Sequence, residues 1–256
     1  MRKKLKAFTL IELIVTMLIM GIIMTGIMRM FDPINSVYTS TSVMSKQRDT
    51  EQGIANYIIE NTRYAQSIGV YQKQSSAAEA MTAFLANHPT DLQGNPLDEN
   101  DLDVICIINN KGYTLNNGTS TTYKGRLIRK ISGQSACGET QPFAYDGTGS
   151  SYMAMGEAYY GPADYYIRIE NFTSSGFDVV VDSDYYYNIG SKNKKFERAN
   201  NASNYTKATV VLANPTVPGT TNVVKVVDNN SSHIDESVGI RTNMTNNTYI
   251  VFYTVE

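Results

Sequence analysis

The sequence predicts an α+β fold in which a long N-terminal helix is joined to a β-rich head built from antiparallel sheets. An apolar run opens the chain, a segment with helical spacing follows it, and β-branched and aromatic runs fill the chain from Asp103 onward. With 256 residues and 42% hydrophobic content, the chain can bury one large core. Its formal net charge of -2 gives the whole protein no strong attraction for nucleic acid or anionic lipid.

The first element is the apolar segment of "MRKKLKAFTLIELIVTMLIMGIIMTGIM". Phe8–Met28 is long enough, at roughly 1.5 Å per residue, to cross about 30 Å of hydrocarbon. The basic residues before it place the N-terminus in the cytoplasm and everything after Arg29 outside. An ordinary secretory signal peptide would have a shorter apolar region and a small-residue cleavage site after it. We therefore expect a membrane-anchored protein with an exported head.

Glu12 is a carboxylate within this run. In a transmembrane helix a carboxylate costs roughly 2.5–3.5 kcal/mol on insertion scales, so a cationic partner is expected. The stretch "KKLKAFTLIELIVTMLIMG" resembles the N-terminus of a type IV prepilin or a type II secretion pseudopilin. The shared features are a short basic leader, a small residue, Phe, two residues, an aliphatic residue, Glu and an unbroken apolar helix.

The resemblance implies that a prepilin peptidase cuts between Ala7 and Phe8 and methylates the new amine of Phe8. Glu12 would become the fifth residue of the mature chain, whose carboxylate pairs in this family with the α-amino group of a neighbouring subunit. Ala7 departs from the family pattern, which normally has Gly before the scissile bond. Residues 1–7 are then the leader, and residues 8–30 the transmembrane and filament-core helix.

Residues 31–70 are expected to form the C-terminal half of the long helix. Asp32-Pro33 interrupts the helical pattern, and the proline either kinks a helix or begins one. From Val37 to about Gln66 the apolar residues recur at helical spacing, which predicts a helix with one face on a sheet. Ser40–Gln52 is too polar for a core, so we expect it to face solvent or neighbouring subunits.

Residues 71–256 are the predicted extracellular head. "SSAAEAMTAFLANHP" predicts a short helix, and an acidic loop follows it. No helix-length crossover separates the later β-rich runs, which indicates antiparallel pairing, in two sheets. The predicted strands are Asp103–Ile108, Thr122–Ile131, Asp164–Glu170, Phe177–Val181, Thr206–Leu212, Asn222–Val227 and Thr248–Val255.

The sequence does not favour an enzyme or a cofactor. Its two histidines, His88 and His233, have no companion residues at zinc-site spacing. The local string "SSHIDE" is read as a polar loop, because a catalytic triad is assembled by the fold rather than by adjacency. Asp98, Asn100 and Asp101 are weak calcium candidates in the acidic loop, which lacks the EF-hand spacing. A solvated charged loop is the favoured interpretation.

Cys106 and Cys137 are a candidate disulfide, since an exported head permits one. The bridge would close a loop of about 30 residues and contribute roughly 3–4 kcal/mol in the chain-entropy model. Two free thiols are the alternative, because sequence does not place the Cβ atoms.

Two basic surfaces are candidates for binding extracellular DNA or another polyanion. The first interleaves tyrosines with basic residues, a texture suited to phosphate contact and base stacking; its basic members are Lys192, Lys194, Lys195, Arg198 and Lys207. The second is one face of a strand, with Lys124, Arg126 and Lys130. A lysine-protected strand edge is the alternative. Without the four leader charges, 18 basic face 24 acidic residues, a net charge of -6.

The sequence therefore predicts a structural subunit of the type IV pilin class, most like a PilW-type minor pilin, with roles in pilus initiation, adhesion or biofilm. The expected partners are other pilin subunits, the prepilin peptidase, the pilus assembly platform and the cytoplasmic membrane before assembly. The expected final location is a cell-surface pilus. A type II secretion or competence pseudopilin is one alternative. An unprocessed membrane-anchored surface binding protein is another.

Overall fold

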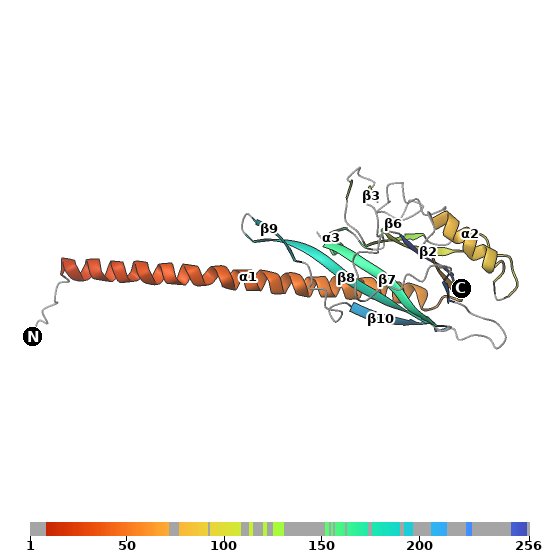
Figure 1. The fold of residues 1–256 in the computed structure, drawn as a ribbon, viewed down its shortest axis with the longest axis horizontal. Coiled ribbons are helices and arrows are strands. Elements are labelled where there is room, and N and C mark those ends of the chain that lie inside the picture. Colours follow the sequence, from red (N-terminus) through yellow and green to blue (C-terminus); the bar gives the residue numbers. More distant parts are fainter. Residues whose placement is uncertain are drawn as a thin grey trace, which may run out of the picture.

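The chain forms a long helical stem that ends inside a β-rich head (Figure 1). The computed structural model describes residues 9–71, 77–91, 93–108, 113–114, 120–121, 125–130, 152–153, 155, 157–161, 163–173, 176–189, 192–196, 206–213, 224–226 and 247–254. Helix α1, Leu10–Thr62, is continuous over 53 residues, which is about 80 Å at 1.5 Å per residue. The predicted combination of an N-terminal helix with antiparallel sheets is confirmed.

Pro33 lies inside α1 and does not end it. The helix ends earlier than the predicted Gln66 and well before residue 70. Arg63 donates its amide to the carbonyl of Ile59, and the amide of Gln66 then turns to the carbonyl of Tyr253. Ser67–Tyr71 consequently forms strand β1, which is buried throughout its length. Ala65 and Ile68 fit the helical spacing of the sequence, but Ile68 lies in strand β1 of the first sheet.

The first sheet has the strand order β11-β1-β12-β2-β5-β6. Its members are β1, β2 (Asp103–Ile108), β5 (Arg126–Lys130), β6 (Tyr152–Met153), β11 (Val224–Val226) and β12 (Thr248–Tyr253). All pairings are antiparallel except that of β1 with β11, which is parallel. The parallel pair involves β1, a strand that the sequence did not predict, whereas the predicted strands pair with one another only in the antiparallel sense.

The second sheet has the order β10-β8-β7, and β9 extends it by pairing with the end of β8. Its members are β7 (Ala163–Thr173), β8 (Gly176–Ile189), β9 (Lys192–Phe196) and β10 (Thr206–Val211). A separate short hairpin joins β3 (Tyr113–Thr114) to β4 (Ser120–Thr121). The seven predicted strands all have a counterpart. The strands that were not predicted are β1, the short strands β3, β4 and β6, the second half of β8, and β9.

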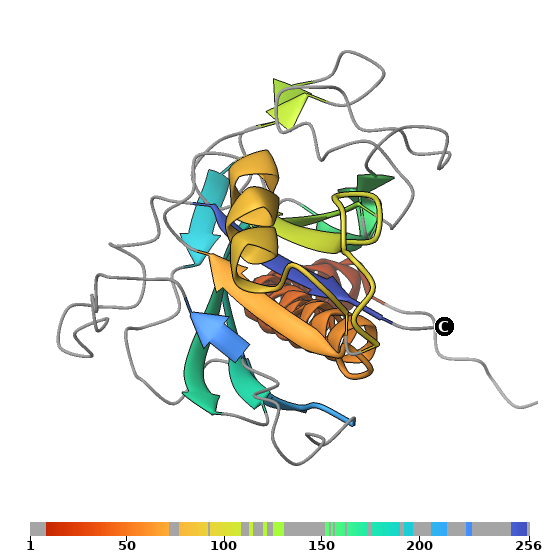
Figure 2. The same ribbon diagram turned by 90° about the vertical axis from the view of Figure 1, so that its right-hand side faces the viewer.

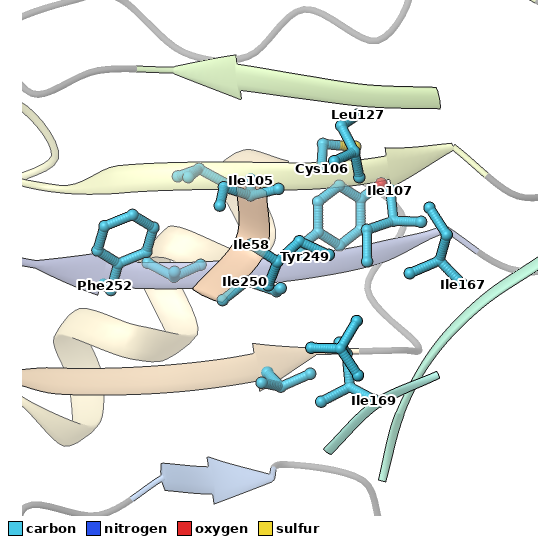
Figure 3. Close-up of a cluster of buried hydrophobic side chains, with 14 of the residues drawn as sticks. Ile58, Ile105, Cys106, Ile107, Leu127, Ile167, Ile169, Tyr249, Ile250 and Phe252 are labelled. Atoms are coloured by element: carbon cyan, nitrogen blue, oxygen red, sulfur yellow. The ribbon is translucent and has the colours of Figure 1, made fainter. Parts of the chain in front are cut away.

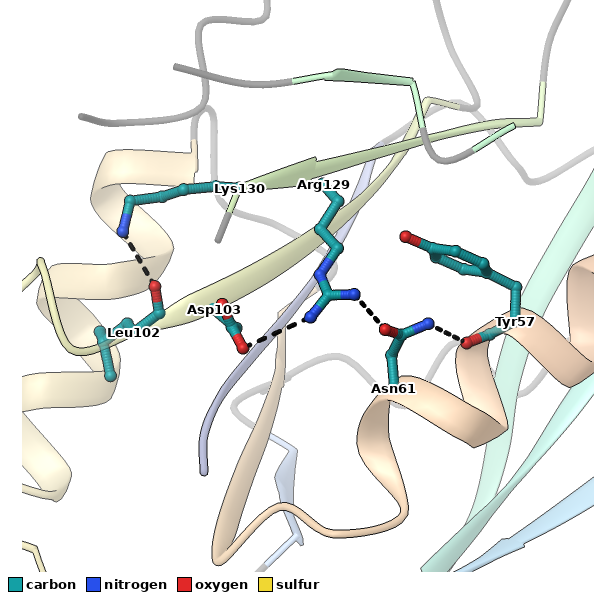
Figure 4. A network of polar contacts seen from close by, with 6 residues as sticks. All are labelled: Tyr57, Asn61, Leu102, Asp103, Arg129 and Lys130. Atoms are coloured by element: carbon teal, nitrogen blue, oxygen red, sulfur yellow. Dashed lines mark hydrogen bonds and ion pairs between the residues drawn. The ribbon is translucent and has the colours of Figure 1, made fainter. Parts of the chain in front are cut away.

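Helix α1 enters the head between the two sheets, and helix α2 (Ala77–Asn87) covers the other face of the first sheet (Figure 2). On the α1 side, Arg129 of β5 donates to Asn61 of α1 (Figure 4). On the α2 side, the rings of Phe84 and Tyr253 meet edge to face, with centroids 6.4 Å apart. The head is therefore layered as second sheet, α1, first sheet and α2.

The core gathers aliphatic side chains from all of the layers around α1 (Figure 3). Ile58 of α1, Ile105 of β2, Ile250 of β12 and Ile167 of β7 are fully buried there. At roughly 1.5–3 kcal/mol for each fully buried large aliphatic side chain, this cluster fixes the position of the C-terminal part of the helix. Among the described residues, the N-terminal part of α1 has no such neighbours, and it projects from the head as a stem (Figure 1).

Candidate assembly site

The stem of α1 has an apolar surface that nothing in the described structure covers. Every residue from Leu10 to Phe31 is exposed, and its large apolar side chains keep between 48% and 78% of their area accessible. The segment is long and apolar enough to cross a membrane. Such a surface is far larger than the apolar patches that soluble monomers expose, so lipid or other helices must cover it.

Hydroxyl groups within the stem are satisfied by the helix itself. Thr16 donates to the carbonyl of Glu12 at 2.9 Å, and Thr25 donates to the carbonyl of Gly21 at 2.8 Å. These bonds use backbone carbonyls of the preceding turn and need no partner from another chain. The threonines are therefore compatible with an apolar environment on all sides.

Glu12 lies in the first turn of α1, where it completes a capping box with Thr9. Its Oε2 accepts from the Thr9 amide and from the Thr9 hydroxyl, each at 2.9 Å. The Glu12 amide donates in return to the Thr9 hydroxyl at 3.4 Å. The box satisfies amides that the start of a helix leaves without partners, and a carboxylate is favoured at the positive end of the helix dipole.

The capping box leaves the charge of Glu12 without a cation from its own helix. Arg29 is the first basic residue that follows Glu12 in the chain, and it lies almost five helical turns away. Ala7 and Phe8, the predicted cleavage pair, lie outside the described residues. The geometry thus presents an exposed carboxylate at the end of an apolar rod.

Residues 2–28 match the prokaryotic N-terminal methylation motif, which is typical of type IV prepilins and pseudopilins. The match includes Glu12 and the predicted cleavage site. The N-terminus of the chain is therefore prepilin-like. No curated protein and no solved structure gives a match to the chain. The motif indicates processing by prepilin peptidase, and it is typical of structural subunits of the pilin class rather than of enzymes.

In the head, polar residues of α1 are buried where the sequence predicted exposure. Gln47, Thr50 and Glu51 keep 4% or less of their surface accessible. Glu51 accepts hydrogen bonds from the hydroxyls of Ser183 on β8 and Thr206 on β10, the latter at 2.8 Å. Gln47 donates to the Ser183 hydroxyl at 2.6 Å. The polar stretch Ser40–Gln52 therefore ends in a network that docks the helix on the second sheet.

The prediction of a basic surface at Lys124, Arg126 and Lys130 is wrong, because Arg126 and Lys130 are buried. Arg126 is fully buried, stacks over the Tyr160 ring at 4.5 Å and donates to the carbonyls of Ala163 and Gly161. Lys130 is 1% exposed. Lys124 lies outside the described residues.

The Lys130 ammonium donates to the carbonyl of Glu99 at 2.6 Å and to that of Leu102 at 2.9 Å. Figure 4 shows the contact with Leu102. Strand alternation does place Arg126 and Lys130 on one side of β5, but that side faces the protein interior. A buried cation needs such hydrogen-bond acceptors. These two residues are therefore part of the packing of the head.

The second basic group is divided among different elements. Lys192, Lys194 and Lys195 lie on β9. Lys207 lies on β10 and forms an ion pair with Asp178 at 2.8 Å, whereas Arg198 is outside the described residues. The five residues therefore do not form one described surface, although three of them share strand β9.

The weak calcium candidates form a compact turn. The Asp98 amide donates to Asp101 at 2.8 Å, and the Asn100 amide donates to Asp98 at 2.6 Å. Among the described residues, no group of three or more metal-ligating side chains is found. The carboxylates of this loop are thus engaged by its own backbone.

The remaining candidates concern the cysteines and histidines. Cys106 is buried in β2, whereas Cys137 lies outside the described residues, so their pairing stays a prediction. His88 stacks on Phe84 with centroids 4.6 Å apart, and His233 is also outside the described residues. The structure therefore does not test whether Cys106 lies near Cys137 or His88 near His233.

Proposed function

We propose that the chain is a minor type IV pilin, of the PilW-like kind, that takes part in pilus initiation or adhesion. The observation that carries the proposal is the exposed apolar stem with its single capped carboxylate at Glu12. A head of this size, on a stem that retains the carboxylate, suits a subunit that enters the filament and presents a folded surface. Other pilin subunits and the assembly platform are its proposed partners.

Processing would occur between Ala7 and Phe8 and would be followed by methylation of the Phe8 amine. The apolar stem would hold the subunit in the cytoplasmic membrane, with the head outside, until assembly. In the filament, the Phe8 amine of a neighbouring subunit would meet the Glu12 carboxylate. A buried ammonium and a buried carboxylate are each costly alone and much less so as a pair, so the contact fixes the axial register.

The capping box supports this pairing because Thr9 becomes the second residue of the processed chain. Its hydroxyl accepts from the Glu12 amide and donates to Oε2 of Glu12. Within the described residues the capping box engages only Oε2, so Oε1 can meet a neighbouring subunit. A carboxylate oriented by its own helix loses less side-chain entropy when the partner amine arrives.

Mass spectrometry of the mature N-terminus, on membranes and on filaments sheared from the cell surface, tests the proposal. We expect N-methylated Phe8 in the sheared fraction. An intact leader confined to membranes would instead favour a membrane-anchored surface protein that does not polymerise. A processed chain that is absent from surface filaments and appears only with a secretion or competence apparatus would favour a pseudopilin.

A further inference from the structure

We propose that the hairpin formed by the end of β8 and by β9 lies against the anionic headgroups of the membrane that α1 spans. The proposal rests on membrane insertion of the stem and not on the assignment as a minor pilin. The hairpin is paired from Tyr185 opposite Phe196 to Ile189 opposite Lys192. In Figure 1, β9 extends beyond the rest of the labelled head toward the N-terminal end of α1.

Hydrogen bonds between α1 and the second sheet establish the direction of this hairpin. Thr206, at the start of β10, bonds to Glu51, and Ala213, just after β10, bonds to the carbonyl of Arg63. Strand β10 therefore runs in the same direction as α1. Because β8 is antiparallel to β10, β8 runs from the C-terminal end of α1 toward the membrane.

The same contacts show how far the hairpin reaches. The two contacts are seven residues apart on the strand side, at Thr206 and Ala213, and twelve residues apart on α1, at Glu51 and Arg63. Twelve helix residues span about 18 Å, so each strand residue advances about 2.6 Å along the helix axis. Ser183 bonds to Gln47 at 2.6 Å. Six further residues of β8 then bring Ile189 about 15 Å closer to the membrane, level with Val37 or its neighbours.

Val37 lies close to the expected membrane surface. Leu10–Met30 is about 30 Å long, which matches the hydrocarbon core of a bilayer. Val37 is about 10 Å beyond Met30 along the helix. The headgroup layer occupies roughly 5–8 Å of that distance. The end of the hairpin is thus within one Debye length, about 8 Å at physiological ionic strength, of the lipid phosphates.

The composition of the hairpin fits such a surface. Strand β9 reads KNKKF, with three lysines and no acidic residue. Lys194 and Lys195 stand opposite Tyr187 and Tyr186, and lysine with tyrosine is typical of the membrane–water interface. On α1, Tyr38 is 73% exposed at the same level. Each lysine near an anionic membrane strengthens attachment about fivefold.

A nucleic acid is the less favoured partner of this hairpin. A DNA-binding surface would need further basic residues beside the hairpin. Arg126 and Lys130 are buried, and Lys207 is paired with Asp178. The stem directs the hairpin toward the lipid in every inserted molecule, so its effective concentration at the bilayer is high. DNA binding is therefore treated as a competing outcome.

The absence of tryptophan from the chain allows single-tryptophan probes in the full-length protein. Asn193→Trp places the probe on β9, and Val211→Trp places it on an exposed residue at the opposite end of the second sheet. Ile22→Trp reports on insertion of the stem. Each variant would be reconstituted in vesicles of phosphatidylcholine, with or without phosphatidylglycerol, containing lipids with nitroxide quenchers in the headgroup or the acyl chain.

We expect headgroup quenching of Asn193→Trp in vesicles that contain phosphatidylglycerol, and its loss in neutral vesicles or at high salt. Val211→Trp should not be quenched in either lipid. In the Asn193→Trp background, Lys194→Gln with Lys195→Gln should lower the ratio of docked to undocked hairpin about 25-fold. Arg63→Gln with Lys207→Gln removes the same charge elsewhere and should leave that ratio unchanged.

Quenching of Asn193→Trp that is no stronger than that of Val211→Trp, or that does not depend on lipid charge, would overturn the proposal. Lysine-dependent binding of duplex DNA in solution, combined with that result, would assign the hairpin to DNA. Acyl-chain quenching of Ile22→Trp separates these outcomes from a failure of membrane insertion. Without it, the membrane anchoring in the proposed function would itself be wrong.

Discussion

The two halves of α1 belong to one continuous helix, but the first half is exposed along its whole surface and the second half is partly buried in the head. From Leu10 to Phe31 all residues are exposed, and they are overwhelmingly apolar. From Gln47 to Thr62 the helix is mixed in composition, and one side of it is buried between two sheets. Hydrophobicity alone would have assigned the first half to the core and the second half to the surface.

This contrast shows that the arrangement of side chains, not their average polarity, determines where each half is placed. The stem is apolar on all sides, as a helix surrounded by lipid or by other helices must be. The head half is apolar on one stripe, and its buried polar residues find partners on β8 and β10. Each half is stable only in its own surroundings.

The largest expected effect is on the free energy of unfolding, and it should differ between one Ile→Ala substitution in the head half of α1 and one in the stem. Ile58→Ala removes a fully buried side chain from the core and should lower the free energy of unfolding by about 2–5 kcal/mol. Ile22→Ala, whose side chain is 65% exposed, should leave it nearly unchanged. Urea unfolding of the full-length protein in detergent, followed by near-ultraviolet circular dichroism, measures both. Equal destabilisation would show that the stem contributes to the fold of the head.

A smaller loss is expected where α1 is docked through polar groups. Ser183→Ala removes the hydroxyl that accepts from Gln47 and donates to Glu51. Because Gln47 and Glu51 are buried, the free energy of unfolding should fall by about 1–3 kcal/mol. Ser45→Ala on the exposed side of α1 should change it by less than about 0.5 kcal/mol. The same urea titration checks both, and a neutral result at Ser183 would mean that apolar packing alone docks the helix.

Much of this architecture could be predicted from local sequence patterns. The alternation of β-branched residues located β2 at its observed bounds, and the apolar run located the stem. Strand β1 could not be found in this way, because Ala65 and Ile68 also continue the helical spacing of α1. Its position depends on hydrogen bonds to Tyr253, almost two hundred residues later. Such a long-range pairing leaves no local trace.

The candidate sites differed in the same manner. Glu12 could be singled out from the sequence because a carboxylate within an apolar run is costly in a membrane, and its pairing with a neighbouring amine stays a prediction. Lys130 was misread, because strand alternation groups residues on a face without saying which face is buried. The network around Glu51 had a usable signal, since Gln47, Thr50 and Glu51 continue the spacing of Ile54 and Ile58. Because these three residues are polar, the stretch was expected to be exposed.

A third prediction distinguishes the two roles of the carboxylate on the stem. Thr9→Val removes the hydroxyl of the capping box, and loss of an N-cap should increase amide exchange in the first turn of α1 about fivefold. Glu12→Gln keeps an acceptor that suits the box and removes the charge. We expect normal exchange but few filaments for Glu12→Gln, and the reverse for Thr9→Val. Hydrogen exchange in detergent and the yield of sheared filaments measure the pair; similar filament yields would argue against pairing of charges.

The smallest expected effect concerns the pH dependence of the sheet that holds the docked half. Burial alone would raise the pKa of Asp178, but hydrogen bonds from Lys207, Thr209 and Asn171 hold that pKa below its usual value. A lowered carboxyl pKa contributes stability above the unfolded pKa near 4, and this contribution is lost as the pH falls through the folded value. Asp178→Asn should therefore cost no more than about 1 kcal/mol at pH 7, and progressively less as the pH falls below about 4. Urea midpoints measured across that range test the sign, because a difference that did not vary with pH would assign the effect to packing between β8 and β10 rather than to charge.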